Sequence, residues 1–285
     1  MTALSTMPAR AAVLVLLSAL LHAIWNALIK REEHPRSAGV AVLAVATAVA
    51  AVSAAFAGRT AFPTPESLRW ALVAGLLEGT YFTALGVALS RGPLGPAYTV
   101  ARGGAMLVAW PVSILFLGES FPWPARVGVL FIALGLGMTA VRPREHATVA
   151  SLLWAGGCAV SIGGYHICYK LALGAGAEPR ALFAVALGCA LPMNAATLGP
   201  RVWADVRKVL RRSPFRIALG GVTCTASFLF FLDALSTTGA GAVLTLRNTS
   251  VLFAQLLALA GGEPPSGRVL GGAALVAGGA LLLAS

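Results

Sequence analysis

Long apolar stretches, separated by short polar breaks, make up most of the chain. A helix needs about 20 mostly apolar residues to cross the hydrocarbon core of a membrane. Ten stretches have that length and character, so the pattern predicts an all-α integral membrane protein with ten transmembrane helices. The stretches are 11–30, 37–57, 69–90, 95–117, 124–141, 149–171, 180–199, 215–237, 241–261 and 268–284.

One break is too charged to cross a membrane. The segment GPRVWADVRKVLRRSP, from 199 onwards, contains several arginines among apolar residues. We expect it to lie at the surface, either as a short amphipathic helix or as a loop.

The composition supports a membrane protein. Of the 285 residues, 58% are hydrophobic and 11% are charged, whereas a soluble domain has about 25% charged residues. The net charge of +11 comes mostly from short loops, as topogenic charge does, so no nucleic-acid partner is expected. The four cysteines lie inside apolar stretches without metal-binding spacing, and we interpret them as packing residues.

A polar stripe runs along the first apolar stretch. His22, Asn26 and Lys30 follow one another at four-residue spacing within LLHAIWNALIK. On a helix this spacing places them on one side. A polar stripe on a membrane helix requires a polar partner or water, so we expect it to face a central cavity.

The chain also contains an internal repeat. The segment at 94–119 aligns with the one at 239–263, and WNALIK at 25–30 aligns with YHICYK at 165–170. Two halves of five helices each, 1–145 and 146–285, must cross the membrane in opposite directions, which gives two inverted five-helix repeats. The aligned residues are Arg102 with Arg247, Glu119 with Glu263, Trp25 with Tyr165, Asn26 with His166, and Lys30 with Lys170.

These features resemble the EamA-type branch of the drug/metabolite transporter superfamily. LHAIWNALIK in the first helix, GE at the end of the fourth and ninth helices, and the five-plus-five repeat carry the resemblance. It implies a secondary carrier, often an exporter, for small metabolites such as amino acids. It also implies a central cavity between the halves and a multi-pass location in a bacterial cell (inner) membrane.

The orientation in the membrane stays open. The resemblance implies that both termini are cytoplasmic. Outside the spans, however, five Lys and Arg residues lie on the side of the termini and thirteen on the other, six of them within 200–216. The positive-inside rule would therefore place the termini outside.

Two arginines lie well inside predicted spans. Arg102 and Arg247 are each about seven residues into their helix, roughly 10 Å deep. A buried charge in a membrane helix marks a candidate functional site. Either the pair binds an anionic substrate group, or each arginine pairs with an acidic residue or with helix-end carbonyls and holds the halves together.

Three other charged residues have alternative interpretations. Glu78 has no acidic counterpart in the repeat, since it aligns with Thr223. It is either a counter-ion of an arginine or a proton carrier for coupled transport. Lys30 and Lys170 end their helices, so they either reach the headgroups or flank an anion site at the cavity mouth.

The remaining candidates for substrate binding are polar and aromatic. Each has an ordinary alternative as a satisfied polar group, a packing residue or an interfacial anchor. They are His22, Trp25, Asn26, Tyr81, Tyr165, His166 and Asn248.

The sequence therefore predicts a transporter that moves a small polar metabolite by alternating access, with an amino acid or another small organic anion as substrate. A lipid flippase and an exporter of cationic or lipophilic compounds with Glu78 as the coupling carboxylate are the alternatives. No GxxxxGK[ST], GxSxG or HExxH motif occurs, so we expect no enzymatic activity, catalytic residue, cofactor or metal. The expected partners are the small-molecule substrate and membrane lipid, and the expected state is a monomer or homodimer.

Overall fold

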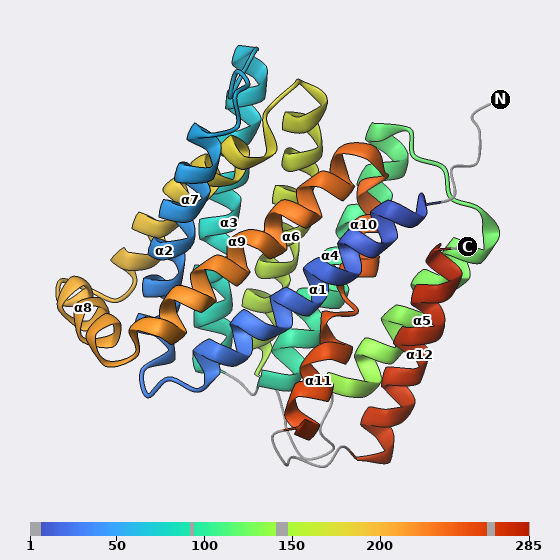
Figure 1. Cartoon of the computed structure of the whole chain (residues 1–285). Coiled ribbons are helices and arrows are strands. Elements are labelled where there is room, and N and C mark those ends of the chain that lie inside the picture. Colours follow the sequence, from blue (N-terminus) through green and yellow to red (C-terminus); the bar gives the residue numbers. More distant parts are fainter. Residues whose placement is uncertain (1–6, 92–93, 141–147, 261–265, 285) are drawn as a thin grey trace.

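The computed structural model describes residues 7–91, 94–140, 148–260 and 266–284, and in these ranges the ordered elements are twelve helices. Figure 1 shows them as one bundle. The helices are α1 (Ala9–Lys30), α2 (Pro35–Ala55), α3 (Pro65–Arg91), α4 (Leu94–Leu117), α5 (Trp123–Ala140), α6 (Val149–Gly174), α7 (Pro179–Ala196), α8 (Val202–Arg212), α9 (Pro214–Thr237), α10 (Ala240–Arg247), α11 (Ser250–Ala260) and α12 (Gly267–Ala284).

Each predicted apolar stretch lies on helical structure, with one difference in detail. The ninth stretch is not one helix, because it is divided into α10 and α11 at Asn248 and Thr249. The charged segment after 199 forms α8, which is the helical alternative of the two that the sequence left open.

Five helices are long and apolar enough to cross a membrane, judged by length and composition within the described ranges. These are α1, α2, α4, α7 and α9, while α5 and α12 contain shorter apolar segments. The chain is therefore a multi-pass integral membrane protein.

The α3 and α6 helices turn polar residues toward the inside of the bundle, where Glu78 of α3 and His166 of α6 are buried. The α3 helix packs along α6, and each of them has a further long neighbour, α7 for α3 and α4 for α6. Polar side chains in membrane helices are favoured on the face that contacts other helices and not on the face toward lipid. The contact between α3 and α6 therefore keeps Glu78 and His166 away from lipid.

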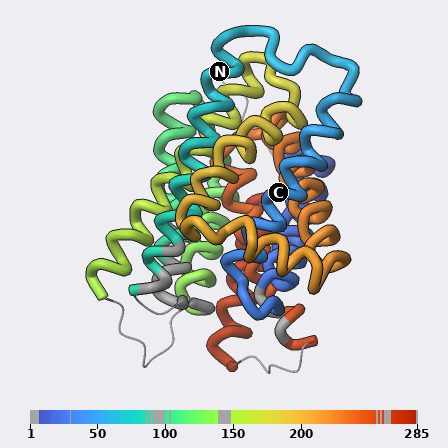
Figure 2. The backbone as a smooth tube through the Cα atoms, turned by 90° about the vertical axis from the view of Figure 1, so that its left-hand side faces the viewer, coloured from blue at the N-terminus to red at the C-terminus, as the bar shows by residue number. Residues whose placement is uncertain are grey.

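The outer helices complete the bundle in pairs. The α1 helix packs along α9, α2 packs against α7 and α9, and α5 packs along α12. Figure 2, turned by 90°, shows α8 lengthwise in front of the bundle, across the direction of the long helices.

Glycines allow the backbones of α5 and α12 to approach closely. A Cβ atom on Gly128 would lie 2.6 Å from the carbonyl oxygen of Gly279, and one on Gly279 would lie 2.5 Å from the carbonyl oxygen of Gly128. Small residues at helix contacts are characteristic of membrane proteins. These glycines are therefore used for packing within the chain.

Candidate functional site

Two buried arginine–histidine pairs lie at the centre of the bundle. Arg102 on α4 approaches His22 on α1, with 2.6 Å between Nη2 and Nε2. Arg247 at the end of α10 approaches His166 on α6, with 3.3 Å between Nη1 and Nε2. The arginines are 7% and 1% exposed. The four side chains also act on one another electrostatically, so the two pairs form one cluster.

Hydrogen bonding defines the state of both histidines. A guanidinium group can only donate, so Nε2 of each histidine accepts and the ring proton is on Nδ1. In His166 this Nδ1–H donates to the carbonyl oxygen of Ile162 at 2.6 Å. In His22 the Nδ1 atom is buried without a hydrogen-bond partner. The histidines are therefore neutral, so neither of them adds charge beside the arginines.

Arg247 is held by aromatic rings. Its Cζ atom lies 4.2 Å from the ring centroid of Phe228 and 4.4 Å from that of Phe231, which are favourable cation–π distances. No salt bridge within the described part of the chain joins Arg247 to an acidic side chain. Its Nε and Nη2 atoms are buried without a hydrogen-bond partner.

Other unpartnered polar atoms in this region are also N–H donors. Trp25 Nε1 and Asn248 Nδ2 are buried without a hydrogen-bond acceptor, as are the atoms of His22 and Arg247 already described. A buried donor without an acceptor costs about 1–3 kcal/mol, and more for a charged group. The cluster therefore has an excess of donors, which an oxygen-rich anionic group would satisfy.

The helix break places Arg247 and Asn248 at this cluster. The backbone N–H of Asn248 donates to Thr245 at 3.0 Å and that of Thr249 to Leu246 at 3.1 Å, which tightens the end of α10. The α11 helix then begins at Ser250. Discontinuous helices commonly form the substrate sites of secondary transporters.

Aromatic residues and Glu78 connect α3 and α6 beside the arginines. The hydroxyl of Tyr169 donates to Glu78 Oε2 at 2.5 Å. The rings of Tyr81 and Tyr165 are 6.2 Å apart, and Tyr165 stacks on His166 at 4.2 Å. Glu78 is buried and has Tyr169 as its direct partner, whereas Arg247 acts on it only electrostatically.

Asn26 and Lys170 do not join this cluster. Asn26 is exposed, and its amide donates to the carbonyl of His22 in its own helix at 2.7 Å. The side chain of Lys30 is outside the part that the structure describes. Lys170 lies at the end of α6, where Nζ donates to the carbonyls of Leu235 and Thr238 at 2.7 and 2.8 Å.

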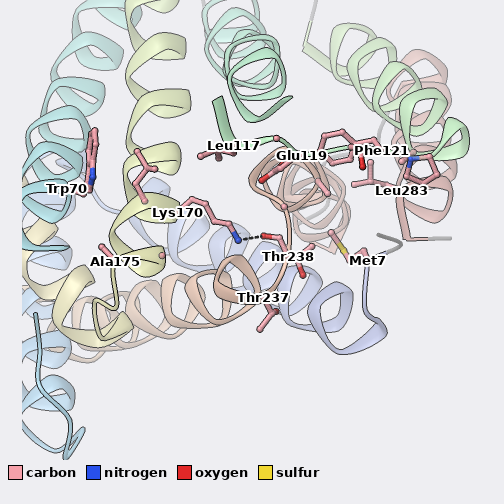
Figure 3. A pocket seen from close by; sticks show the side chains of 18 of the residues that line it. Met7, Trp70, Leu117, Glu119, Phe121, Lys170, Ala175, Thr237, Thr238 and Leu283 are labelled. Atoms are coloured by element: carbon pink, nitrogen blue, oxygen red, sulfur yellow. Dashed lines mark hydrogen bonds between the residues drawn. The ribbon is translucent and has the colours of Figure 1, made fainter. Parts of the chain in front are cut away.

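Lys170 lines a separate cavity of about 630 Å³ (Figure 3). Glu119 lines it too, and its carboxylate accepts from the backbone N–H groups of Ala240 at 2.6 Å and Gly241 at 3.2 Å. The N-terminus of α10 is therefore at this cavity and its C-terminus is at Arg247. The eight residues of α10 separate the two places by roughly 12 Å.

Several contacts at the centre could not be expected from the sequence. Phe228 and Phe231 belong to the run FLFF, which looks like any lipid-facing segment. The hydrogen bond between Tyr169 and Glu78 joins two residues that are 91 positions apart in the sequence. Glu119 stood out only as a marker of the repeat, and its counterpart Glu263 lies outside the described residues.

The described residues hold no group of three or more His, Cys, Asp or Glu side chains that could bind a metal ion. Cys158, Cys168 and Cys224 are buried, Cys189 is half-buried, and all four are free thiols. The chemistry that this site offers is therefore that of hydrogen-bond donors and positive charge.

The second half of the chain matches the model of a transporter family. Residues 149–285 match the EamA-like transporter family. This match confirms the resemblance found in the sequence, and it indicates a multi-pass membrane transporter with a small-molecule substrate.

The fold also occurs in a solved structure. A crystal structure of another protein superposes with a TM-score of 0.74, covers 95% of both chains and is 19% identical in sequence. At this identity the likeness concerns the fold alone. No curated protein sequence matches the chain.

Proposed function

We propose that the protein is a secondary transporter for a small anionic metabolite, such as an amino acid or another organic acid. The anionic group binds between Arg102 and Arg247, and transport proceeds by alternating access in the direction of export. The observation that carries this proposal is the buried excess of N–H donors beside two arginines whose histidine neighbours are neutral.

The balance of charge supports an anion over a cation. Arg247 has no acidic partner in direct contact among the described residues, and Glu78 is engaged by Tyr169. Uncompensated buried charge is unfavourable by several kcal/mol. A carboxylate or phosphate supplies both the negative charge and several acceptor atoms, whereas a cationic substrate would add to the repulsion.

The proposal includes ten transmembrane helices arranged as inverted repeats over 1–145 and 146–285. The helix contacts are consistent with such a relation. Exchanging α1 with α6, α2 with α7 and α3 with α9 turns the α1–α9 contact into α6–α3, and α2–α9 into α7–α3, which also occur. Likewise the α4–α6 contact corresponds to contacts of α1 with α10 and α11.

The site draws on corresponding helices of both proposed repeats. His22, Glu78 and Arg102 come from the first, and His166 and Arg247 come from the second. A substrate bound between them would contact both halves, as alternating access requires. A bacterial inner membrane and a monomeric or homodimeric state complete the proposal, on the strength of the family resemblance.

The test is ligand-dependent thermal stabilisation of the purified protein. Amino acids, organic acids, phosphonates and amines are compared on the wild type, on Arg247→Met and on the control Arg69→Met, whose side chain is 66% exposed. A ligand that binds only the folded protein raises the melting temperature. Losing one charge-assisted hydrogen bond, about 1.5–3 kcal/mol, weakens binding roughly 10- to 150-fold.

We expect an anion to stabilise the wild type and the control but not Arg247→Met. Stabilisation by amines or lipophilic cations alone would overturn the anion proposal. It would support the alternative of a cation exporter that uses Glu78.

A further inference from the structure

The α8 helix lies at the edge of the bundle, between two long apolar helices. It connects α7 and α9, and both of these are long and apolar enough to cross a membrane. Figures 1 and 2 show α8 at the edge of the bundle and across the long helices. A helix placed in this way, between the ends of two membrane helices, lies at the level of the lipid headgroups.

One face of α8 is fixed to the protein. Val202, Val206 and Val209 are at helical spacing, and they are 5%, 4% and 6% exposed. The helix packs against α2, α7 and α9. Because its apolar face is already buried in the bundle, α8 presents its opposite face outwards in a defined orientation.

The outward face is basic and contains one aromatic residue. Trp203, Arg207 and Arg211 follow one another at four-residue spacing, and Lys208 lies beside them. All four are exposed, and Trp203 is 53% exposed. We call these four residues the basic face of α8. In the described ranges no salt bridge involves its three cations.

Two neighbouring cations differ from those of the basic face, because they form salt bridges within the protein. Arg212 forms a salt bridge with Glu33, and Arg216 forms one with Glu32 at 2.6 Å. The acidic residues of the α1–α2 turn thus neutralise the cations next to them. The cations of α8 that are not paired point away from the bundle, beside one exposed acidic residue, Asp205.

We propose that the basic face of α8 binds the phosphate headgroups of anionic phospholipids. Arginine and lysine near a membrane surface are attracted to anionic lipids. Tryptophan prefers the interface between hydrocarbon and water. The combination of three unpaired cations with one exposed indole on a helix at the boundary matches an anionic lipid surface in both charge and polarity.

The experiment compares three additives on the purified full-length protein in detergent. These are phosphatidylglycerol, phosphatidylcholine and inorganic phosphate, and the readout is the melting temperature as a function of additive concentration. The variant Arg207→Gln/Lys208→Gln/Arg211→Gln removes the charge of the basic face. The control Arg59→Gln/Arg180→Gln removes exposed cations at the other ends of α2 and α7.

Phosphatidylglycerol should stabilise the wild type and the control by binding to the folded state. The triple variant should require about 100-fold more of this lipid, since each cation near the surface contributes several-fold to affinity. Equal stabilisation by phosphatidylcholine would indicate binding through acyl chains, and equal stabilisation by phosphate would indicate a site for free anions. Either result, or an unchanged response of the triple variant, overturns the proposal.

A folding defect would not be mistaken for lost lipid binding. The melting temperature of the triple variant without lipid reports whether it is folded. If it is not, Lys208→Gln alone should still need several-fold more phosphatidylglycerol, and an unchanged requirement would contradict the proposal.

Discussion

Replacing Arg247 by methionine tests whether this arginine binds substrate or only stabilises the fold. The substitution removes two cation–π contacts at 4.2 and 4.4 Å, each worth about 0.5–2 kcal/mol. It also removes the hydrogen bond to His166 at 3.3 Å, worth about 0.5–1.5 kcal/mol. The expected loss in unfolding free energy from contacts is therefore roughly 1.5–5.5 kcal/mol.

The same substitution also removes two features that lower the stability of the unliganded protein, a buried charge and unsatisfied hydrogen-bond donors. Burying a charge costs several kcal/mol, and Arg247 leaves Nε and Nη2 without acceptors, at about 1–3 kcal/mol each. Methionine fills a similar volume with apolar atoms. The two sides nearly cancel, so we predict that the unliganded Arg247→Met variant unfolds at the wild-type temperature or above it, although stabilisation by the anion disappears.

The assay is thermal unfolding in detergent with and without the anionic ligand. A structural arginine gives the opposite pattern. Removing one partner of a buried ion pair typically costs about 3–5 kcal/mol, so a large fall in melting temperature without ligand would refute the reasoning. Unchanged ligand stabilisation in a folded variant would refute it as well.

Three further predictions concern the supporting structure, each measured by equilibrium unfolding in detergent. Glu119→Gln should lower the unfolding free energy by about 1 kcal/mol, because it weakens the charged cap on α10; an unchanged value would mean that the cap contributes nothing. Tyr169→Phe should cost about 1–3 kcal/mol by leaving Glu78 without its donor, and little of this should persist in a Glu78→Gln background. Gly279→Ala should cost about 1–3 kcal/mol by forcing two backbones apart, whereas Gly137→Ala, which meets no atom within 4 Å, should be tolerated.

The sequence was most informative about the helices. Apolar length and short polar breaks located helical structure in all ten stretches, because a membrane helix must satisfy its backbone hydrogen bonds internally and cover them with apolar side chains. The sequence did not predict the helix break after Arg247. Residues 241–261 remain apolar through it. The break itself consists of 3₁₀-type turns, in which the N–H groups of Asn248 and Thr249 donate to carbonyls three residues back.

The sequence was less informative about contacts between helices. It singled out Arg102, Arg247, His22 and His166, and the structure brings these together, because polar residues in membrane helices gather away from lipid. It did not predict which histidine each arginine contacts. Asn26 shares the polar stripe with His22 but is exposed, since the two positions differ by about 40° around the helix.

The most direct test of the proposed function is counterflow in proteoliposomes. Vesicles containing the protein are loaded with an unlabelled anion that stabilises it, and uptake of the same labelled anion is followed without any imposed gradient of coupling ions. We predict uptake by the wild type and by Arg69→Met, and none above empty vesicles for Arg247→Met. Equal uptake by Arg247→Met would contradict an anion site at the buried arginines.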